Sequence, residues 1–336
     1  MYGYYPGQKY AGRFFQERKR SLDKAKGAVI DETRHFDVVV SGAAGFIGSH
    51  LLHQLSSAGK CVLALDRITP QENRNEDVTW MVTDLEDTRW PDCLYHTIEG
   101  CPAWVHLAWD MSRGAGVYLT QAKQLSVFAR LLNVWSESQV CRLVIMGSAA
   151  EYGRREGLIH EDERPILPLS PYGWAKYSAS LLAESWAHSG DRQVTWLRPF
   201  VVYGPGQRGD MLIPYALSHA FSHSPASFSD GEQERDFVYV ADVIEAIIAA
   251  LAPGKPGFHL YNVGSGQAVK VQSVLREIEQ VTGVQGLFEL GVRPRKKSEP
   301  QCQIAHIERA REVLDWYPRT LLREGLRRTV EGLINE

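Results

Sequence analysis

The chain has 336 residues, of which 44% are hydrophobic and 23% charged, and its formal net charge is −3. This is enough for one large domain or two coupled ones with a full core, and the charge gives no reason to expect a nucleic-acid partner or a membrane surface. No apolar run approaches the roughly 20 residues of a membrane helix, so we expect a soluble, cytoplasmic protein.

The five cysteines are odd in number and their spacings match no zinc pattern, so the sequence predicts no metal site. Cys61 and Cys141 start runs that are typical of buried strands. We expect small reduced core residues, which fits a reducing cytoplasm.

Residues 1–35 differ from the rest of the chain. A stretch rich in tyrosine and glycine leads into a charged run from Gln16 to Lys26. We expect an N-terminal extension that is a mobile tail. The alternative is an arm that packs on a partner subunit through its tyrosines.

From Phe36 onward, apolar strands alternate with helices. The pattern predicts strands at 36–40, 61–65, 78–82, 103–107, 142–146 and 194–197, and helices at 46–55, 121–135 and 172–188. This alternation favours an α/β fold with a Rossmann-type, doubly wound parallel sheet covered on both faces.

After Pro199 the alternation weakens. Loops are expected at 204–206 and 222–231, a strand at 237–240 and a helix at 243–251. Helical spacing returns at 271–281, where Gly283 is a natural stop, and again at 307–314. The last third therefore indicates a smaller mixed α/β domain.

The strongest local signal is the run Gly42-Ala-Ala-Gly45-Phe-Ile-Gly48, which follows a predicted strand and opens a predicted helix. Gly42 would permit a tight turn, Gly45 a close approach to a pyrophosphate, and Gly48 tight packing of helix on strand. The start of the helix would then offer its free N–H groups to phosphate. The run predicts a dinucleotide site.

Acidic residues follow two of the predicted strands. Asp66 ends the second strand, where its carboxylate can accept both adenosine ribose hydroxyls and repel a 2′-phosphate. This favours NAD over NADP, although the neighbouring Arg67 could weaken the repulsion of a 2′-phosphate. Asp84 could meet the adenine amino group or simply cap a turn.

Tyr172 and Lys176 are four residues apart on a predicted helix and so share one face. A nearby ammonium and a cationic nicotinamide would both favour the tyrosine phenolate, which could then act as general base on a hydroxyl. Ser148 follows the fifth strand and could hydrogen-bond to the reacting oxygen. Together these residues predict alcohol–ketone interconversion.

These features and others in the same order resemble the extended short-chain dehydrogenase/reductases, the NAD-dependent epimerase/dehydratase family. The resemblance runs from about Phe36 to Leu333. Its motifs are the glycine run, Asp66, His106-Leu-Ala108, Ser148-Ala-Ala-Glu-Tyr-Gly153, Pro171-Tyr-Gly-Trp-Ala-Lys176, Arg198-Pro-Phe200, Tyr203-Gly-Pro205, Arg235-Asp-Phe237, Asn262-Val-Gly-Ser-Gly266 and Arg293-Pro294.

The resemblance implies a nucleotide-sugar substrate lying between two domains, and a homodimer formed by the helices at 121–135 and 172–188. It also implies an NAD-binding domain at 36–200, to which 236–264 returns, and a substrate-binding domain at 201–235 and 265–336. The implied cofactor-binding residues are Gly42, Gly45, Phe46, Ile47, Gly48, Asp66, Arg67, Asp84, Leu85, Leu107, Ala108, Tyr172 and Lys176. The implied substrate-binding residues are Ser148, Tyr172, Arg208, Arg235 and Arg293.

Several positions depart from the family pattern. Ala149 and Ala150 stand where dehydratases and decarboxylases carry an acid, and Glu151 is in another register, which disfavours both reactions. Val201 stands where galactose epimerases usually have asparagine. Trp109 replaces a usually small residue beside the cofactor, and Gln124 stands where asparagine is common.

Three hypotheses remain. A 4-epimerase, favoured by Asp66, would keep NAD bound. A 4-ketoreductase of a nucleotide-linked 4-keto-6-deoxyhexose, favoured by Arg67, Val201 and the residues around Ser148, would consume NAD(P)H at each turnover. A catalytically silent NAD-binding scaffold on the same fold is the third, and the presence of Ser148, Tyr172 and Lys176 argues against it.

Overall fold

The computed structural model describes residues 34–335 apart from 70–75, 88–93, 95–96, 99, 112–113, 139, 168 and 296–298. Nearly all of the expected N-terminal extension, residues 1–33, and Cys93 therefore lie outside the described residues. Among the residues described, no helix has both the length and the apolar character needed to cross a membrane.

A seven-stranded sheet forms the centre of the larger part of the molecule, in the order β12-β7-β5-β4-β1-β2-β3. Every neighbouring pair in it is parallel, so the expected doubly wound parallel sheet is confirmed. Its strands are β1 (Val38–Ser41), β2 (Val62–Asp66), β3 (Val78–Val82), β4 (Ala103–His106), β5 (Arg142–Met146), β7 (Gln193–Pro199) and β12 (Gly257–Val263).

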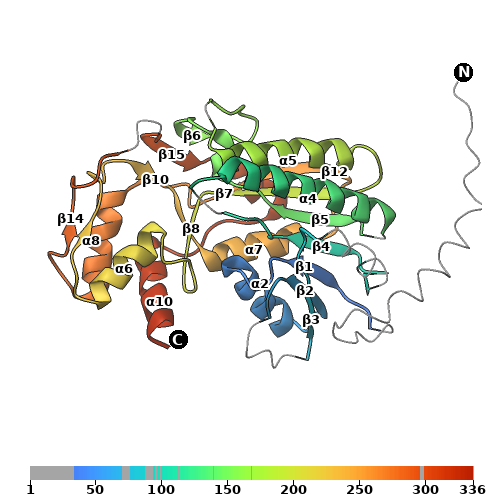
Figure 1. Ribbon diagram of the computed structural model, residues 1–336, viewed down its shortest axis with the longest axis horizontal. Helices are drawn as coiled ribbons and strands as arrows, with labels where there is room; N and C mark the ends of the chain where they lie inside the picture. The colour runs from blue at the N-terminus through green and yellow to red at the C-terminus, as the bar shows by residue number, and fades with distance from the viewer. Residues whose placement is uncertain are drawn as a thin grey trace, which may run out of the picture.

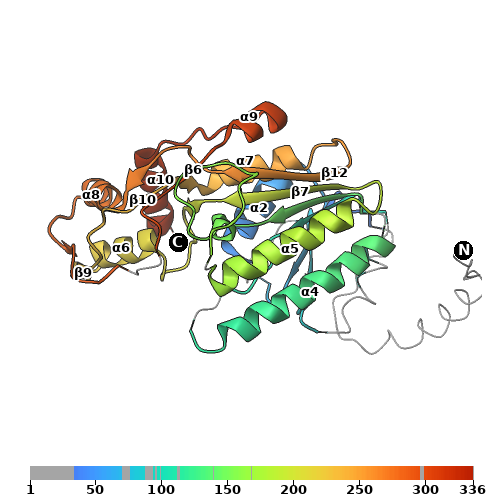
Figure 2. The ribbon, with the colours of Figure 1, turned by 90° about the horizontal axis from the view of Figure 1, so that it is seen from above.

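Helices cover both faces of this sheet (Figure 1). Helices α4 (Val117–Glu137) and α5 (Pro171–Ala187) lie side by side on one face, and α2 (Phe46–Ser57) and α7 (Val240–Ala250) cover the other (Figure 2). Successive strand residues point to opposite faces. In β1, Val39 packs into the core beneath α4 and α5, whereas its neighbours pack into the core shared with α2 and α7.

The smaller part of the molecule contains a mixed four-stranded sheet in the order β13-β10-β15-β6. Its strands are β6 (Gly157–Ile159), β10 (Glu234–Arg235), β13 (Val269–Lys270) and β15 (Cys302–Ala305). Two parallel pairs join β8 (Val201–Tyr203) to β11 (Phe237–Tyr239), and β9 (Ala226–Ser227) to β14 (Phe288–Glu289). The helices here are α6 (Leu212–Phe221), α8 (Val271–Thr282), α9 (Glu308–Leu314) and α10 (Leu322–Asn335).

The sequence missed α6, β12 and α10. Strand β12 lies at the edge of the large sheet and pairs with β7 alone, and its first four residues are only half-buried. It therefore lacks the continuous apolar run that identifies a central parallel strand. The expectation that Cys61 and Cys141 are core residues is wrong, because Cys61 is half-buried and Cys141 is exposed at the strand ends.

Candidate active site

The glycine run forms a tight turn between β1 and α2. Gly42 has φ +79°, and a Cβ on it would lie 2.5 Å from the backbone nitrogen of Ala108. A Cβ on Gly48 would lie 2.2 Å from the Gly42 carbonyl oxygen. Larger side chains at these two positions would therefore push the turn away from both β4 and α2. A Cβ on Gly45 would meet only the Gly42 carbonyl oxygen, at 3.2 Å, so the turn leaves its outer side open.

The N-terminus of α2 is suited to an anion. Gly45 is its N-cap, and within this fully described helix no side chain caps the first turn and no acidic residue occupies it. The N–H groups at Phe46 and Ile47 thus carry the positive end of the helix dipole. The side chains of these two residues pack against the core, so any contribution to cofactor binding would come from their backbone.

Asp66 is held against the glycine run by backbone donors. Its Oδ2 accepts from the Ala44 N–H at 2.9 Å, and its Oδ1 accepts from the Arg67 N–H at 2.7 Å. Asp84 Oδ1 accepts from the Glu86 N–H at 2.9 Å, so Asp84 caps a turn. Asp84 therefore caps this turn and also borders the cleft described in the next paragraph.

A cleft of about 380 Å³ opens along the carboxyl ends of the central strands. Its acidic and glycine-lined walls and the free start of α2 fit the ribose and pyrophosphate of a pyridine dinucleotide. Of the residues expected to bind the cofactor, Gly42, Gly45, Asp66, Arg67, Asp84, Leu85, Leu107 and Ala108 line this cleft.

The cleft wall includes residues that the sequence did not assign to the cofactor. Gln124 of α4 donates from Nε2 to Glu86 Oε1 at 3.0 Å and accepts from the Asp110 N–H at 3.2 Å. Trp109 and Arg208 also line the cleft. Arg208 is thus placed beside the dinucleotide cleft, whereas the sequence assigned it to the substrate.

Ser148 and Tyr172 come together from two different elements. Ser148 is the N-cap of the short helix η2 (Ala149–Tyr152), and its Oγ accepts from the Ala150 N–H at 3.1 Å. Tyr172 lies in the first turn of α5, which is capped by Ser170 and has Pro171 at its start. The Ser148 hydroxyl lies beside the Tyr172 phenol and lowers its pKa.

The protein's own groups do not by themselves favour the Tyr172 phenolate. Burial raises the pKa of Tyr172 above its usual range, the Ser148 hydrogen bond lowers it, and the Glu151 carboxylate raises it further. Within the protein alone, desolvation of the phenolate outweighs any neighbouring charge. Acidification of Tyr172 therefore requires a positive charge from a bound group in addition to Lys176.

Lys176 lies one turn further along α5 and is almost fully buried. Its Nζ donates to the Met146 carbonyl oxygen at 2.7 Å and lies 3.8 Å from the centroid of the Trp109 ring. Burial lowers the pKa of Lys176 to about 7, and the Glu151 carboxylate opposes this shift. Burial therefore makes the ammonium form of Lys176 less favourable than it is for an exposed lysine.

Glu151 was not predicted as a site residue, yet it lies at the base of the site. Its buried carboxylate accepts from the Ser148 N–H at 2.8 Å, from Trp196 Nε1 at 3.0 Å and from Arg198 Nε at 2.7 Å. The Ser148-x-x-Glu151 spacing is that of a capping box, and this signal could have identified the residue. With these three donors, Glu151 is a structural ion-pair partner that fixes the Ser148 turn.

The arginines expected to bind a substrate diphosphate lie in the smaller part and are all engaged. Arg235 donates to Glu299 at 2.7 Å, to the Pro300 carbonyl oxygen at 2.9 Å and to the Glu234 carbonyl oxygen at 2.7 Å. Arg293 donates to Tyr215 Oη at 2.8 Å, and Arg208 pairs with Asp210 on the surface at 3.2 Å.

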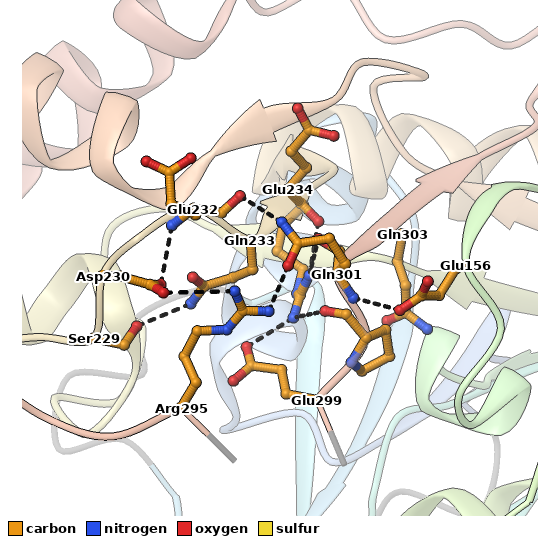
Figure 3. A network of polar contacts seen from close by, with 12 residues as sticks. Glu156, Ser229, Asp230, Glu232, Gln233, Glu234, Arg295, Glu299, Gln301 and Gln303 are labelled. Atoms are coloured by element: carbon orange, nitrogen blue, oxygen red, sulfur yellow. Dashed lines mark hydrogen bonds and ion pairs between the residues drawn. The ribbon is translucent and has the colours of Figure 1, made fainter. Parts of the chain in front are cut away.

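A polar network joins Glu156, Gln301 and Arg295 in the smaller part of the molecule (Figure 3). At its centre Gln301 accepts from Arg295 at 2.6 Å and donates to Glu156 at 2.6 Å and to the Glu232 carbonyl oxygen at 2.9 Å. These bonds connect the loop after η2 with β10 and with the segment before β15. Through Pro300, which Arg235 contacts, and Gln301, the network ties Arg235 to the loop that follows η2.

Comparison with known proteins agrees with this arrangement. Residues 38–264 match the NAD dependent epimerase/dehydratase family. The chain is 30% identical to the uncharacterized UDP-glucose epimerase YtcB of Bacillus subtilis, over 86% of this chain and 95% of that protein. It is 27% identical to a UDP-glucuronate 4-epimerase of Thermodesulfobacterium geofontis, over 87% and 94% of the two chains. The structure of MoeE5 in complex with UDP-glucuronic acid and NAD is similar, with a TM-score of 0.79, 33% identity and coverage of 89% and 99%.

Proposed function

This chain belongs to the NAD dependent epimerase/dehydratase family, and on that premise we propose that it is an NAD-dependent 4-epimerase of a UDP-sugar. The observation that carries the proposal is that Ser148 lies beside Tyr172, with Lys176 one turn away on the same helix. The relatives named as UDP-sugar 4-epimerases, and a similar structure that holds a UDP-sugar and NAD, support the same activity.

In the proposed mechanism, Tyr172 would take the proton from the sugar C4 hydroxyl and later return it to the same oxygen, once the 4-keto sugar presents its opposite face to the cofactor. Ser148 hydrogen-bonds to the same oxygen and holds it beside the phenol. Lys176 supplies positive charge that favours the phenolate. NAD, when bound, supplies the acceptor that takes up hydride from C4 and gives it back.

The proposed cofactor-binding residues are the eight that line the cleft, together with the backbone at Phe46, Ile47 and Gly48 and the side chains of Tyr172 and Lys176. Asp66 favours NAD over NADP because its fixed carboxylate would repel a 2′-phosphate. For the substrate diphosphate we assign Arg235 and Arg293, whose guanidinium groups suit phosphate oxygens. Arg208 stays a candidate for the substrate, although it also borders the dinucleotide cleft.

The surroundings of Ser148 favour epimerisation over dehydration or decarboxylation. Ala149 and Ala150 offer no titratable group, and both oxygens of Glu151 are occupied by buried donors, including Arg198. Nothing in this turn can therefore deliver a proton to a second carbon of the sugar. The remaining chemistry is oxidation and reduction at one carbon.

The proposed organisation keeps an NAD-binding domain at 36–200 with 236–264, and a substrate-binding domain at 201–235 and 265–336. The proposed assembly is a homodimer through α4 and α5, where Leu181 and Leu182 are 48% and 39% exposed. Leu132 of α4 is buried and cannot contribute to this interface. The described cysteines are free thiols, which suits the cytoplasm as the proposed compartment.

The proposal is tested by giving the purified protein UDP-glucose and UDP-glucuronate separately and following the products and the nicotinamide absorbance. An epimerase produces the C4 epimer without net cofactor consumption. Consumption of NADH or NADPH in step with product, on a 4-keto sugar, would instead establish the ketoreductase. No turnover with any nucleotide sugar would favour the silent scaffold.

Two variants sharpen this test. Tyr172→Phe should lower kcat by about 10²- to 10⁴-fold, the usual contribution of a general base. Tyr177→Phe, on the same helix and half-buried, is the matched control and should leave kcat unchanged. Equal effects of the two variants would show that Tyr172 is not the base.

A further inference from the structure

Lys176 has a partner that the proposed chemistry does not assign. The Trp109 ring lies 3.8 Å from the ammonium nitrogen, measured to the ring centroid. At this distance the negative face of an indole attracts a cation, and the attraction is greatest where water is excluded. Lys176 is almost fully buried and donates to the Met146 carbonyl oxygen, so the ring faces an ammonium that is shielded from water.

The orientation of Trp109 is fixed by hydrogen bonds on its other side. The indole Nε1 donates to Gln121 Oε1 at 2.8 Å, and Gln121 Nε2 donates to the Asp110 carbonyl oxygen at 2.7 Å. Gln121 is completely buried in α4, so its amide cannot turn away to water. The ring also packs against Phe128, with centroids 6.5 Å apart. These contacts hold the indole face against the lysine.

We propose that Trp109 is a positioning residue that holds the Lys176 ammonium charged and in place at the edge of the dinucleotide cleft. Trp109 lines that cleft. Among the described residues that line it, only Trp109 and His106 have aromatic side chains. The role deepens the proposed function and rests on it, because it assigns Trp109 to the same lysine that favours the Tyr172 phenolate.

The charged and titratable groups around Lys176 act in different directions. Glu151 of η2 favours the ammonium, and burial disfavours it. His106 of β4 faces Lys176 but stays neutral, since burial and the lysine charge both lower the pKa of His106 to about 3. Tyr172 is one turn away on α5. Glu151 favours the ammonium by its negative charge. The neutral indole of Trp109 favours the ammonium without adding a negative charge to the cleft.

The test is to measure the titration of Lys176 directly, by NMR of protein labelled with ¹³C at lysine Cε, with a Lys176→Met variant assigning the resonance. Trp109→Leu keeps an apolar cover but removes the aromatic face, and it should lower the pKa of Lys176 by about one pH unit, a tenfold change in protonation. Trp109→Phe keeps an aromatic face and should titrate closer to the wild type.

A second variant keeps the test valid if Trp109→Leu does not fold. Gln121→Leu releases the indole N–H without removing the ring, and it should shift the Lys176 titration in the same direction by a smaller amount. Trp186→Leu is the control, because Trp186 also lies beside a cation, Arg192, at 4.3 Å, but does not contact Lys176. It should leave the Lys176 titration unchanged.

Identical Lys176 titrations in the wild type, Trp109→Leu and Trp109→Phe would overturn the proposal. So would a rise of the pKa in Trp109→Leu, which would mean that the ring only excludes water. Because the titration needs no turnover, this result is separate from the epimerase assay: a protein with no epimerase activity could still show the shift. In an active enzyme, the alkaline fall of kcat in Trp109→Leu should begin about one pH unit lower.

Discussion

A Cβ on Gly173 would lie 2.2 Å from the carbonyl oxygen of Ala150. The absence of a side chain at this position lets the first turn of α5 approach the η2 turn closely, and the two turns carry Tyr172 and Ser148. The pair that the proposed chemistry depends on is therefore built by backbone contact between two elements. The two side chains lie beside each other because the elements that carry them are already in place.

Gly173→Ala should separate these two turns. The extra methyl group would meet backbone, which cannot move aside cheaply, so we expect a loss of about 1–3 kcal/mol in unfolding free energy. A small displacement at a reacting centre can also cost about 10²-fold in rate, so kcat should fall by that order. Chemical denaturation and steady-state kinetics measure the two effects.

The control for this prediction is Gly190→Ala, near the other end of α5. The three atoms nearest to a Cβ there all belong to the flexible side chain of Arg192. This variant should keep wild-type kcat. If Gly173→Ala also kept it, the close approach of α5 and η2 would not matter for catalysis.

Asp66→Ala should relax the choice between the two dinucleotides. The carboxylate is fixed by the Ala44 and Arg67 backbone donors, and its removal takes away both the ribose acceptor and the repulsion of a 2′-phosphate. We expect the ratio of NADP to NAD affinity to rise by about tenfold or more, which corresponds to about 1.4 kcal/mol. Calorimetric titration of protein stripped of cofactor gives this ratio.

Asp84→Ala provides the comparison, because Asp84 borders the same cleft but caps a turn through the Glu86 N–H. Both affinities should change together in this variant, and their ratio should stay constant. An unchanged ratio in Asp66→Ala would remove the argument for NAD preference.

Removing only one partner of the Glu151–Arg198 ion pair should lower the unfolding free energy. Both side chains are almost fully buried, and Glu151→Ala would leave the guanidinium without its carboxylate. Loss of one partner of a buried pair costs about 3–5 kcal/mol. The double variant Glu151→Gln/Arg198→Met should lose less than the sum of the two single changes, as measured by urea unfolding. Additive losses would show that the two residues act independently.

His106 should make the fold sensitive to acid. Burial lowers the pKa of His106 from 6.5 to about 3, and its Nδ1 is 2.8 Å from Ser41 Oγ. The unfolded chain takes up a proton below about pH 6.5, whereas the folded chain does not until about pH 3. The stability from the neutral ring is therefore complete above pH 6.5 and decreases as the pH falls through this window.

Between pH 7 and pH 4.5 this decrease amounts to about 3 kcal/mol. The difference in unfolding free energy between wild type and His106→Asn, followed against pH, should show it. His53→Asn, which changes an exposed histidine of α2, is the matched control. Parallel pH curves for wild type and His106→Asn would contradict the assignment.

Much of the large sheet and the dinucleotide cleft could be predicted, because the information is local. The glycine run and Asp66 each follow an apolar strand, and parallel strands bring their carboxyl ends to one edge. The C-terminal helix α10 could not be predicted, since Gly325 and Gly332 weaken its helical signal. Tertiary packing requires both: a Cβ on Gly325 would lie 2.1 Å from Tyr203 Oη, and one on Gly332 would lie 2.7 Å from Pro205.

The electrostatics of the site were also beyond the sequence. The Tyr172-x-x-x-Lys176 spacing places both residues on one face of α5, but it does not reveal that burial raises the pKa of Tyr172. Nor does it reveal that Lys176 contacts the Trp109 ring, which comes from a segment 67 residues earlier in the chain. Burial and long-range contacts determine the pKa values of Tyr172 and Lys176, and the spacing of residues along a helix reveals neither of them.

The most direct test of the proposed activity uses a UDP-sugar that carries deuterium at C4. The account predicts that the purified protein forms the C4 epimer, that the deuterium stays at C4 of both epimers, and that no reduced dinucleotide accumulates. Loss of the deuterium to solvent, or product formed only as added NADH or NADPH is consumed, would contradict the epimerase.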